Sequence, residues 1–199
     1  MKWLLVYRDG PLGDAWRAAF ADTAHIEVLR GDITKVPCDA IVSPANSFGF
    51  MDGGLDLALS ERFGWGLQER LREAIRALPE RELLVGKALA VPTLDRKVPW
   101  LIAAPTMRVP MSHQIATSVN AYLAMKAILL VAQTHESIST VAIPGLCTGV
   151  GRMSARTAAR QMHAAFAEVV LGRWPDFADF GDAQQRQIEL NPQGLIWDY

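Results

Sequence analysis

The groups best suited to act on a bound anion gather between residues 43 and 56. Asn46 follows a short apolar run that we expect to be a strand, and its amide offers both a donor and an acceptor. Such a group can fix a sugar hydroxyl or a water molecule. Gly53 and Gly54 stand together directly before a helical pattern. Paired glycines at that point let backbone N–H groups approach an anion at the positive end of the helix, so we expect an anion site here.

Two carboxylates flank this glycine pair. Asp52 precedes it, and Asp56 lies in the first turn of the expected helix. Either could orient or deprotonate a water molecule. An acid in the first turn is often only a complement to the helix dipole, worth about 0.3–1 kcal/mol, and that interpretation fits Asp56 better than Asp52. A carboxylate near a helix N-terminus should also have a lowered pKa, which predicts a weak base.

A second glycine-rich loop, residues 144–151, again lies between an expected strand and an expected helix. Its composition is similar to that of a phosphate-cradling loop, but it lacks the lysine of the P-loop motif and the glycine spacing GxGxxG. Cys147 lies near the start of the next helix, where thiol pKa values are lowered, so it is a candidate nucleophile. The sequence assigns it no partner histidine, and we interpret Cys147 as a passive small residue.

A third loop, Gly31-Asp32-Ile33-Thr34, follows another expected strand. Gly31 permits a sharp turn, after which Asp32 presents an acceptor-only carboxylate at the edge of the sheet. Such a group can bind an exocyclic amine or a ribose hydroxyl. The alternative is a turn or helix cap, where aspartate is favoured for local reasons.

Short apolar runs alternate with longer amphipathic patterns along most of the chain. The runs predict strands at 3–7, 25–29, 39–43, 88–91, 100–104 and 140–143. The amphipathic patterns predict helices at 14–20, 55–63, 67–78, 115–133 and 155–170. The last of these carries a continuous apolar stripe, with Arg156, Arg160 and Glu168 off it. This alternation predicts an α/β fold with helices on both faces of a mostly parallel sheet, whose carboxyl edge carries the loops.

Composition narrows the classes of function. The chain has 199 residues, which suits one domain, and a formal net charge of -1, so no global basic field would hold nucleic acid. Two cysteines cannot build a disulfide scaffold or a four-cysteine zinc site, and His25, His113, His135 and His163 show no metal-ligand spacing. Neither a signal peptide nor a membrane helix is expected. We expect one cytoplasmic domain over 1–199 that uses no metal or cofactor and binds neither membrane nor nucleic acid directly.

Taken in order, the three loops resemble those of the macro domain family. That family has a Gly-Asp-Ile-Thr turn, a strand ending in Asn-Pro-Ala-Asn or similar, a glycine-rich loop with Val/Ile-Asp opening a helix, and a late loop with Ser/Thr-Gly-Val. The corresponding segments here are residues 31–34, 43–46, 53–56 and 147–150. The resemblance covers residues 25–172 and implies a three-layer α/β/α sandwich with a mixed, mostly parallel central sheet. We expect residues 173–199 to form an extension that packs on this domain.

The macro domain family binds ADP-ribose and its derivatives, and some members hydrolyse them. By resemblance, Asp32 accepts a hydrogen bond from the adenine amine, and the Ile33 N–H meets the ring. Backbone donors of the two glycine-rich loops would surround the diphosphate: Gly53, Gly54, Leu55, Cys147, Thr148, Gly149, Val150 and Gly151. Asn46 would hold the distal ribose near its anomeric carbon.

The sequence departs from the family pattern in two places. Two consecutive glycines follow Met51-Asp52, where the family often has three. Gly151 stands where the family often has an aromatic residue against the distal ribose, and Phe48 or Phe50 could supply that wall instead. The form of the first loop resembles a bacterial and phage branch of the family.

These observations lead to three hypotheses. The first is a hydrolase that removes ADP-ribose from a modified acceptor, or a phosphate or ester from an ADP-ribose derivative, with Asn46, Asp56 and Asp52 as catalytic residues. Its partners would be ADP-ribose or ADP-ribosylated macromolecules. The second is a non-catalytic ADP-ribose-binding module, because both functions need the same pocket. The third, a NAD-dependent oxidoreductase, is opposed by the absence of GxGxxG after the first strand.

Overall fold

The computed structural model describes residues 1–8, 10–111 and 115–193. The strands of this part of the chain form one sheet in the order β2-β1-β6-β3-β5-β4. They are β1 (Lys2–Tyr7), β2 (Ile26–Arg30), β3 (Ala40–Ser43), β4 (Leu89–Pro92), β5 (Trp100–Ala103) and β6 (Thr140–Ile143). Neighbouring strands are parallel except β4 and β5, which are antiparallel. The expected mixed, mostly parallel sheet is confirmed.

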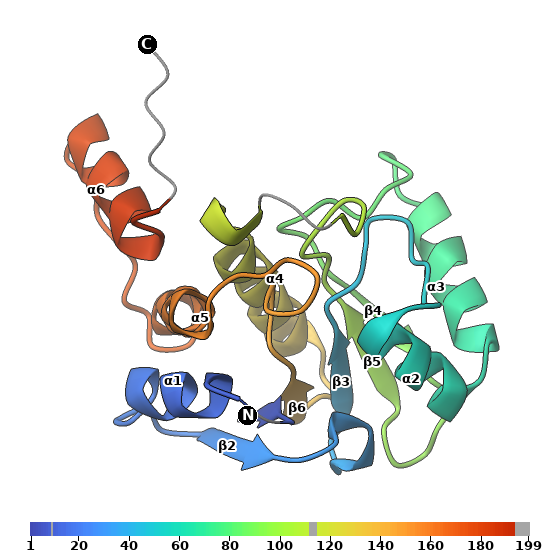
Figure 1. Cartoon of the computed structure of the whole chain (residues 1–199). Helices are drawn as coiled ribbons and strands as arrows, with labels where there is room; N and C mark the ends of the chain where they lie inside the picture. Colours follow the sequence, from blue (N-terminus) through green and yellow to red (C-terminus); the bar gives the residue numbers. More distant parts are fainter. Residues whose placement is uncertain (9, 112–114, 194–199) are drawn as a thin grey trace.

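Helices cover both faces of this sheet, as Figure 1 shows. They are α1 (Leu12–Ala19), α2 (Gly54–Phe63), α3 (Gly66–Arg76), α4 (Asn120–Thr134), α5 (Ala155–Val169) and α6 (Phe180–Leu190), with short 3-10 helices η1 (Ile33–Lys35) and η2 (Ile115–Thr117). α1, α4 and α5 pack on one face, α2 and α3 pack on the other, and α6 lies outside against α5. No helix in the described ranges is long and apolar enough to cross a membrane.

The central strands feed two apolar cores, because successive side chains of a strand point to opposite faces. In β1, Trp3, Leu5 and Tyr7 belong to the core beneath α1, α4 and α5. Leu4 and Val6 belong to the core beneath α2 and α3. Because β1 is buried on both faces, its sequence is a continuous apolar run and not an alternating pattern.

Several expected helices have different bounds in the structure, and two of these differences have a clear local cause. The helix expected over 115–133 is interrupted, with η2 at its start and α4 beginning only at Asn120. Ser118 explains the break, because its hydroxyl donates to the Ile115 carbonyl (2.6 Å) and accepts from the Asn120 N–H (3.2 Å). The helix expected over 67–78 ends at Arg76, close to Pro79, because the residue before a proline disfavours the helical conformation.

The C-terminal extension contains a helix that the sequence analysis did not predict. α6 begins after Asp179, whose carboxylate accepts a hydrogen bond from the Asp182 N–H (3.1 Å). Leu190 is its buried residue. Most residues of this helix are polar, so its sequence lacks the continuous apolar stripe of residues 155–170.

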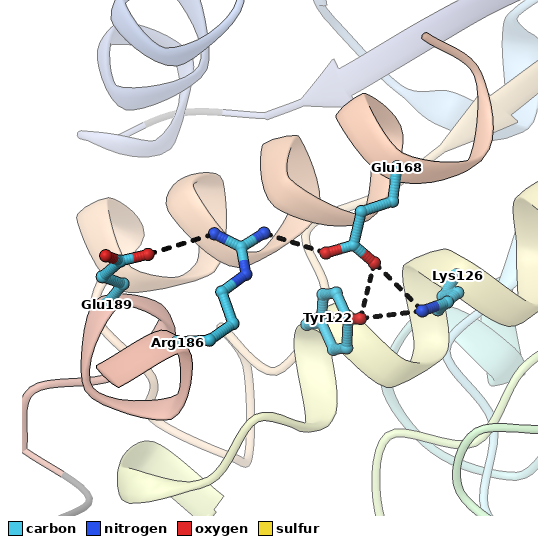
Figure 2. Close-up of polar contacts among 5 residues, drawn as sticks. All are labelled: Tyr122, Lys126, Glu168, Arg186 and Glu189. Carbon is cyan, nitrogen blue, oxygen red and sulfur yellow. Dashed lines mark hydrogen bonds and ion pairs between the residues drawn. The ribbon is translucent and has the colours of Figure 1, made fainter. Parts of the chain in front are cut away.

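The expectation that Glu168 lies off the buried face of α5 was wrong. Its side chain is fully buried. Tyr122 and Lys126 of α4 and Arg186 of α6 all contact its carboxylate, as Figure 2 shows. These partners supply the opposite charge and the hydrogen bonds that a buried carboxylate needs.

Candidate functional site

The loops that leave β1, β3, β5 and β6 surround a cavity of about 590 Å³ at the carboxyl edge of the sheet. Ligands of open α/β sheets bind at this edge. The predicted site residues that line the cavity are Asn46, Asp52, Gly53, Gly54, Leu55, Asp56, Cys147, Thr148, Gly149, Val150 and Gly151. The fold thus brings together two glycine-rich loops that lie far apart in the sequence.

Asn46 lies at the cavity wall, but most of its side chain holds the loop that follows it. Its Nδ2 donates to the Phe50 carbonyl (2.7 Å), and its Oδ1 accepts from the backbone N–H groups of Phe48 (3.1 Å) and Phe50 (3.3 Å). Both acceptor positions of the oxygen are used, so one proton of Nδ2 remains for a ligand. Asn46 can therefore donate to a sugar hydroxyl or a water, but its oxygen is already occupied.

Asp56 lies in the first turn of α2, with its carboxylate against Ser43 at the end of β3. The Ser43 hydroxyl donates to Asp56 Oδ1 (2.5 Å), and Ser43 is fully buried. Burial raises the pKa of Asp56 to about 6; the hydrogen bond from Ser43 opposes this rise, and the negative charge of Asp52 adds to it. The expectation of a lowered pKa was wrong, because the loss of hydration outweighs the effect of the helix N-terminus.

The N-terminus of α2 opens into the cavity at Gly53 and Gly54. Gly53 is the N-cap residue, and no side chain in the described chain caps this end of the helix. The first backbone N–H groups of a helix have no intrahelical acceptor, so those of α2 can serve a ligand. Gly54 has a φ of 57°, a left-handed conformation that glycine adopts without strain. This helix end can hold an anion by backbone donors, and exposed Asp52 lies at its rim.

The second glycine-rich loop has a tightly packed backbone with one open position. A Cβ on Gly145 would lie 2.5 Å from Thr148 Oγ1, and one on Gly151 would overlap the Ile115 side chain. Any other residue at either position would force its neighbours to move. A Cβ on Gly149, in contrast, would meet open space. The loop therefore has a fixed shape that leaves room for a ligand beside Gly149.

Cys147 lines the cavity in an unusual conformation, with a φ of 63°. Its side chain is buried, and this burial raises the pKa of the thiol to about 12. The lowering that a helix N-terminus can give is not observed here. At neutral pH almost no thiolate is present, so Cys147 is a poor nucleophile and contributes to the wall of the site.

Asp32 and Ile33 do not line this cavity. Asp32 Oδ1 caps η1 by accepting hydrogen bonds from the Thr34 N–H (3.0 Å) and the Thr34 hydroxyl (2.7 Å), and the hydroxyl lowers the pKa of Asp32. Its Oδ2 lies 3.9 Å from Lys35 Nζ. The cap interpretation of Asp32 is thus observed directly, whereas its contact with an adenine stays a prediction.

The structure adds cavity residues that the sequence analysis did not place there. Arg8 directly follows β1 and is the one basic side chain lining the cavity among the described residues. Thr106 and Met107 follow β5, and Met107 pairs with Asn46 in an isolated parallel bridge. The sequence could have indicated all three residues, because each comes just after an apolar run that predicts a strand. The residues that follow parallel strands lie at the carboxyl edge of the sheet, where ligands bind.

The two aromatic candidates for a ribose wall lie in different places. Phe50 lines the cavity, whereas the Phe48 ring lies beneath the Arg108 guanidinium, 4.9 Å from the ring centre. His113 lies outside the described residues. Within the described ranges, no three His, Cys, Asp or Glu side chains gather as metal ligands would.

Sequence comparison identifies related chains over most of this structure. A family model for the Macro domain matches residues 42–162. The chain is 36% identical over 152 residues to an uncharacterized protein of Aeropyrum pernix, covering 76% of this chain and 75% of that protein. It is 30% identical over 150 residues to a macro domain-containing protein of Cupriavidus necator, covering 73% of this chain and 82% of that protein.

Solved structures of similar shape include two bacterial macrodomains. The macrodomain of Mycobacterium tuberculosis DarG has a TM-score of 0.59 at 21% identity, covering 70% of this chain and 88% of that one. A mutant macrodomain of Oceanobacillus iheyensis with ADPR has a TM-score of 0.62 at 20% identity, covering 78% of this chain and 88% of that one. At such identities the likeness concerns the fold alone.

Proposed function

This chain belongs to the macro domain family, and we propose that its cavity binds ADP-ribose or an ADP-ribose derivative. The observation that supports this most directly is the meeting of the open α2 N-terminus and the loop around Gly149 in one cavity. Two sets of backbone donors can hold a diphosphate without a basic patch, which suits a net charge of -1. A macrodomain with ADPR has the same fold.

The ligand would lie along the carboxyl edge of the sheet, with its adenine toward β2 and its distal ribose toward β3. Asp32 would accept from the adenine amine, and the Ile33 N–H would meet the ring. Arg8, at the end of β1, would face the adenosine half or the diphosphate. Asn46 would donate its remaining proton to the distal ribose, close to Asp56.

The same arrangement supports hydrolysis as the reaction. Asp56, when ionised, would take a proton from a water molecule, and the oxygen of that water would bond to the anomeric carbon of the distal ribose. The bond from this carbon to the acceptor oxygen would break, the acceptor would leave with the bonding electrons, and the proton held by Asp56 would pass to the acceptor oxygen through water. A carboxylate with a pKa of about 6 is a stronger base than an ordinary aspartate and is still mostly ionised above neutral pH. Asp52, exposed at the rim, is the second candidate for holding the water.

The acceptor in this proposal is an ADP-ribosylated macromolecule or a small ADP-ribose derivative. Phe50 and Val150 line the cavity and are 45% and 52% exposed, so they give its mouth an apolar rim that a modified protein could cover. Cys38 and Cys147 are free and buried, which suits a reducing compartment such as the cytoplasm.

Calorimetry with ADP-ribose tests the binding proposal, with AMP and NAD as competitors. A clearly lower dissociation constant for ADP-ribose than for AMP or NAD supports the binding proposal, and the absence of binding of all three contradicts it.

Hydrolysis is tested with ADP-ribosylated protein and with ADP-ribose 1″-phosphate. Asp56→Asn should lower turnover more than affinity, while Glu61→Gln, an exposed carboxylate change on the same helix, should do neither. Tight binding without turnover on either substrate would favour a binding module.

A further inference from the structure

We propose that the C-terminal extension, through α6 and Asn191, positions the second glycine-rich loop of the cavity and so contributes to ligand affinity. The extension lies outside the segment 42–162 that matches the family model, and none of its described residues, 173–193, lines the cavity. The proposal rests on the proposed function for its effect on binding. The positioning itself is carried by a chain of contacts within the protein.

The first contact joins the end of α6 to η2. Asn191 follows α6 and is 1% exposed, although its side chain is polar. Its Nδ2 donates to the backbone carbonyls of Ala116 and Ser118, each at 2.9 Å. Its Oδ1 accepts from the Gln193 N–H (3.1 Å). Both Nδ2 protons of Asn191 are therefore used, and they connect the residue that follows α6 to η2 and to Ser118.

A buried glutamine of α5 completes this attachment. Gln161 is fully buried, and its Nε2 donates to the Ser118 carbonyl (2.8 Å) and to the Leu190 carbonyl at the end of α6 (3.4 Å). Its Oε1 accepts from the Tyr122 N–H (3.2 Å). The Ser118 carbonyl thus accepts from both Asn191 and Gln161. The segment between η2 and α4 is thus held by two amides, Asn191, which directly follows α6, and Gln161 of α5, which also contacts the end of α6.

The second contact joins this segment to two walls of the cavity. The Ile115 side chain lies so close to Gly151 that a Cβ on Gly151 would overlap it. Asn120, at the start of α4, donates from Nδ2 to the carbonyl of Thr106 (2.8 Å). Both Gly151 and Thr106 line the cavity. A shift of η2 would therefore remove support from the second glycine-rich loop.

The third element is the anchor that keeps α6 in place. Figure 2 shows Arg186 of α6 between Glu168 of α5 and Glu189 of its own helix. Arg186 Nη2 lies 2.9 Å from Glu168 Oε1, and Lys126 Nζ lies 3.0 Å from Glu168 Oε2. Glu168 is fully buried, so its pairs are poorly screened by solvent, unlike the exposed contact of Arg186 with Glu189. α6 is thereby tied to α5 and, through Glu168, to α4.

Hydrogen exchange on the full chain tests the positioning without any ligand. Asn191→Ala should raise amide exchange both in residues 115–118 and in residues 144–153, with exchange in β1 unchanged. Arg186→Gln loosens α6 without altering a side chain that contacts η2, and it should produce the same pattern to a smaller degree. If Asn191→Ala does not fold, Arg186→Gln still provides the exchange test. Glu189→Gln, which changes an exposed side chain of α6, is the matched control and should leave both segments at wild-type exchange.

Affinity provides the second measurement. Asn191→Ala should weaken ADP-ribose about tenfold and should weaken AMP less, because AMP lacks the second phosphate and the distal ribose that would reach the loop around Gly149. A general loss of stability would not change the ratio of the two affinities. Faster exchange confined to residues 115–118, or an unchanged ratio, would overturn the proposal. If the wild type binds no ADP-ribose, the proposed function fails, and the exchange of residues 144–153 still decides whether α6 positions the loop.

Discussion

Replacing Asp56 by asparagine should stabilise this protein at neutral pH. In the unfolded chain the Asp56 carboxyl has its ordinary pKa of 3.8, and burial in the folded protein raises it to about 6. Between these values the folded state keeps a proton that the unfolded state has released, so stability falls as the pH rises through this window. The shift corresponds to about 3 kcal/mol once the pH is above the folded-state pKa. Asparagine keeps the volume and the acceptor for Ser43 but has no charge to bury.

Urea unfolding of the wild type and of Asp56→Asn across the range from about pH 3.5 to pH 8 measures this effect. The two proteins should have similar free energies of unfolding at the acid end, and the variant should gain up to about 3 kcal/mol at the alkaline end. Glu61→Gln, at an exposed position of the same helix, should follow the wild type at every pH. A constant difference between Asp56→Asn and the wild type over the whole range would refute the reasoning, because it would mean that burial does not perturb this carboxyl.

Three further outcomes are expected, two at the cavity residues Gly149 and Arg8 and one at Asp32, outside the lining. Gly149→Glu should fold, because its Cβ meets open space, and should abolish ADP-ribose binding in calorimetry by placing a negative side chain where the diphosphate would lie; retained binding would show that this loop is only a turn. Arg8→Ala should weaken ADP-ribose roughly threefold to tenfold and flatten the dependence of the dissociation constant on salt, since Arg8 is the basic side chain of the lining; an unchanged salt dependence would place Arg8 away from the ligand. Asp32→Ala should weaken ADP-ribose on the order of tenfold to a hundredfold, and loss of the η1 cap should reduce the free energy of unfolding by about 1 kcal/mol. If the stability falls and the dissociation constant does not move, Asp32 is only a cap.

The parts of the fold that sequence predicts well are those that local patterns determine. β1 and β6 are short apolar runs because both faces of each strand are buried, and such runs can be recognised without knowing their partners. The two glycine-rich loops were placed at one edge of the sheet because each follows a strand, and the fold brings them to one cavity. α6 was not predicted because most of its residues are polar, so its sequence lacks a continuous apolar stripe.

The electrostatic state of the site could not be predicted in the same way. The pKa of Asp56 depends on its burial against Ser43. Ser43 lies at the end of β3, whereas Asp56 lies in α2, one loop later in the sequence. The sequence near Asp56 indicates only a helix N-terminus, which lowers the pKa of a nearby carboxylate, whereas burial raises it. The same holds for Glu168, whose partners Lys126 and Arg186 come from two other helices. Charged side chains become buried through tertiary contacts, and the sequence pattern of a single helix does not reveal those contacts.

The cavity also draws on parts of the chain that the family segment 42–162 does not contain. β1 lies between β2 and β6, so it links the strand before the Asp32 loop to the strand before the second glycine-rich loop. Its end places Arg8 in the lining. At the other end of the chain, Asn191 holds η2, and Ile115 packs against Gly151. Backbone donors hold an anion well only if the backbone is fixed, and Asn191, outside the family segment, holds the η2 segment whose Ile115 packs against Gly151. Residues on both sides of the family segment therefore contribute to the cavity, Arg8 by lining it and Asn191 by holding η2.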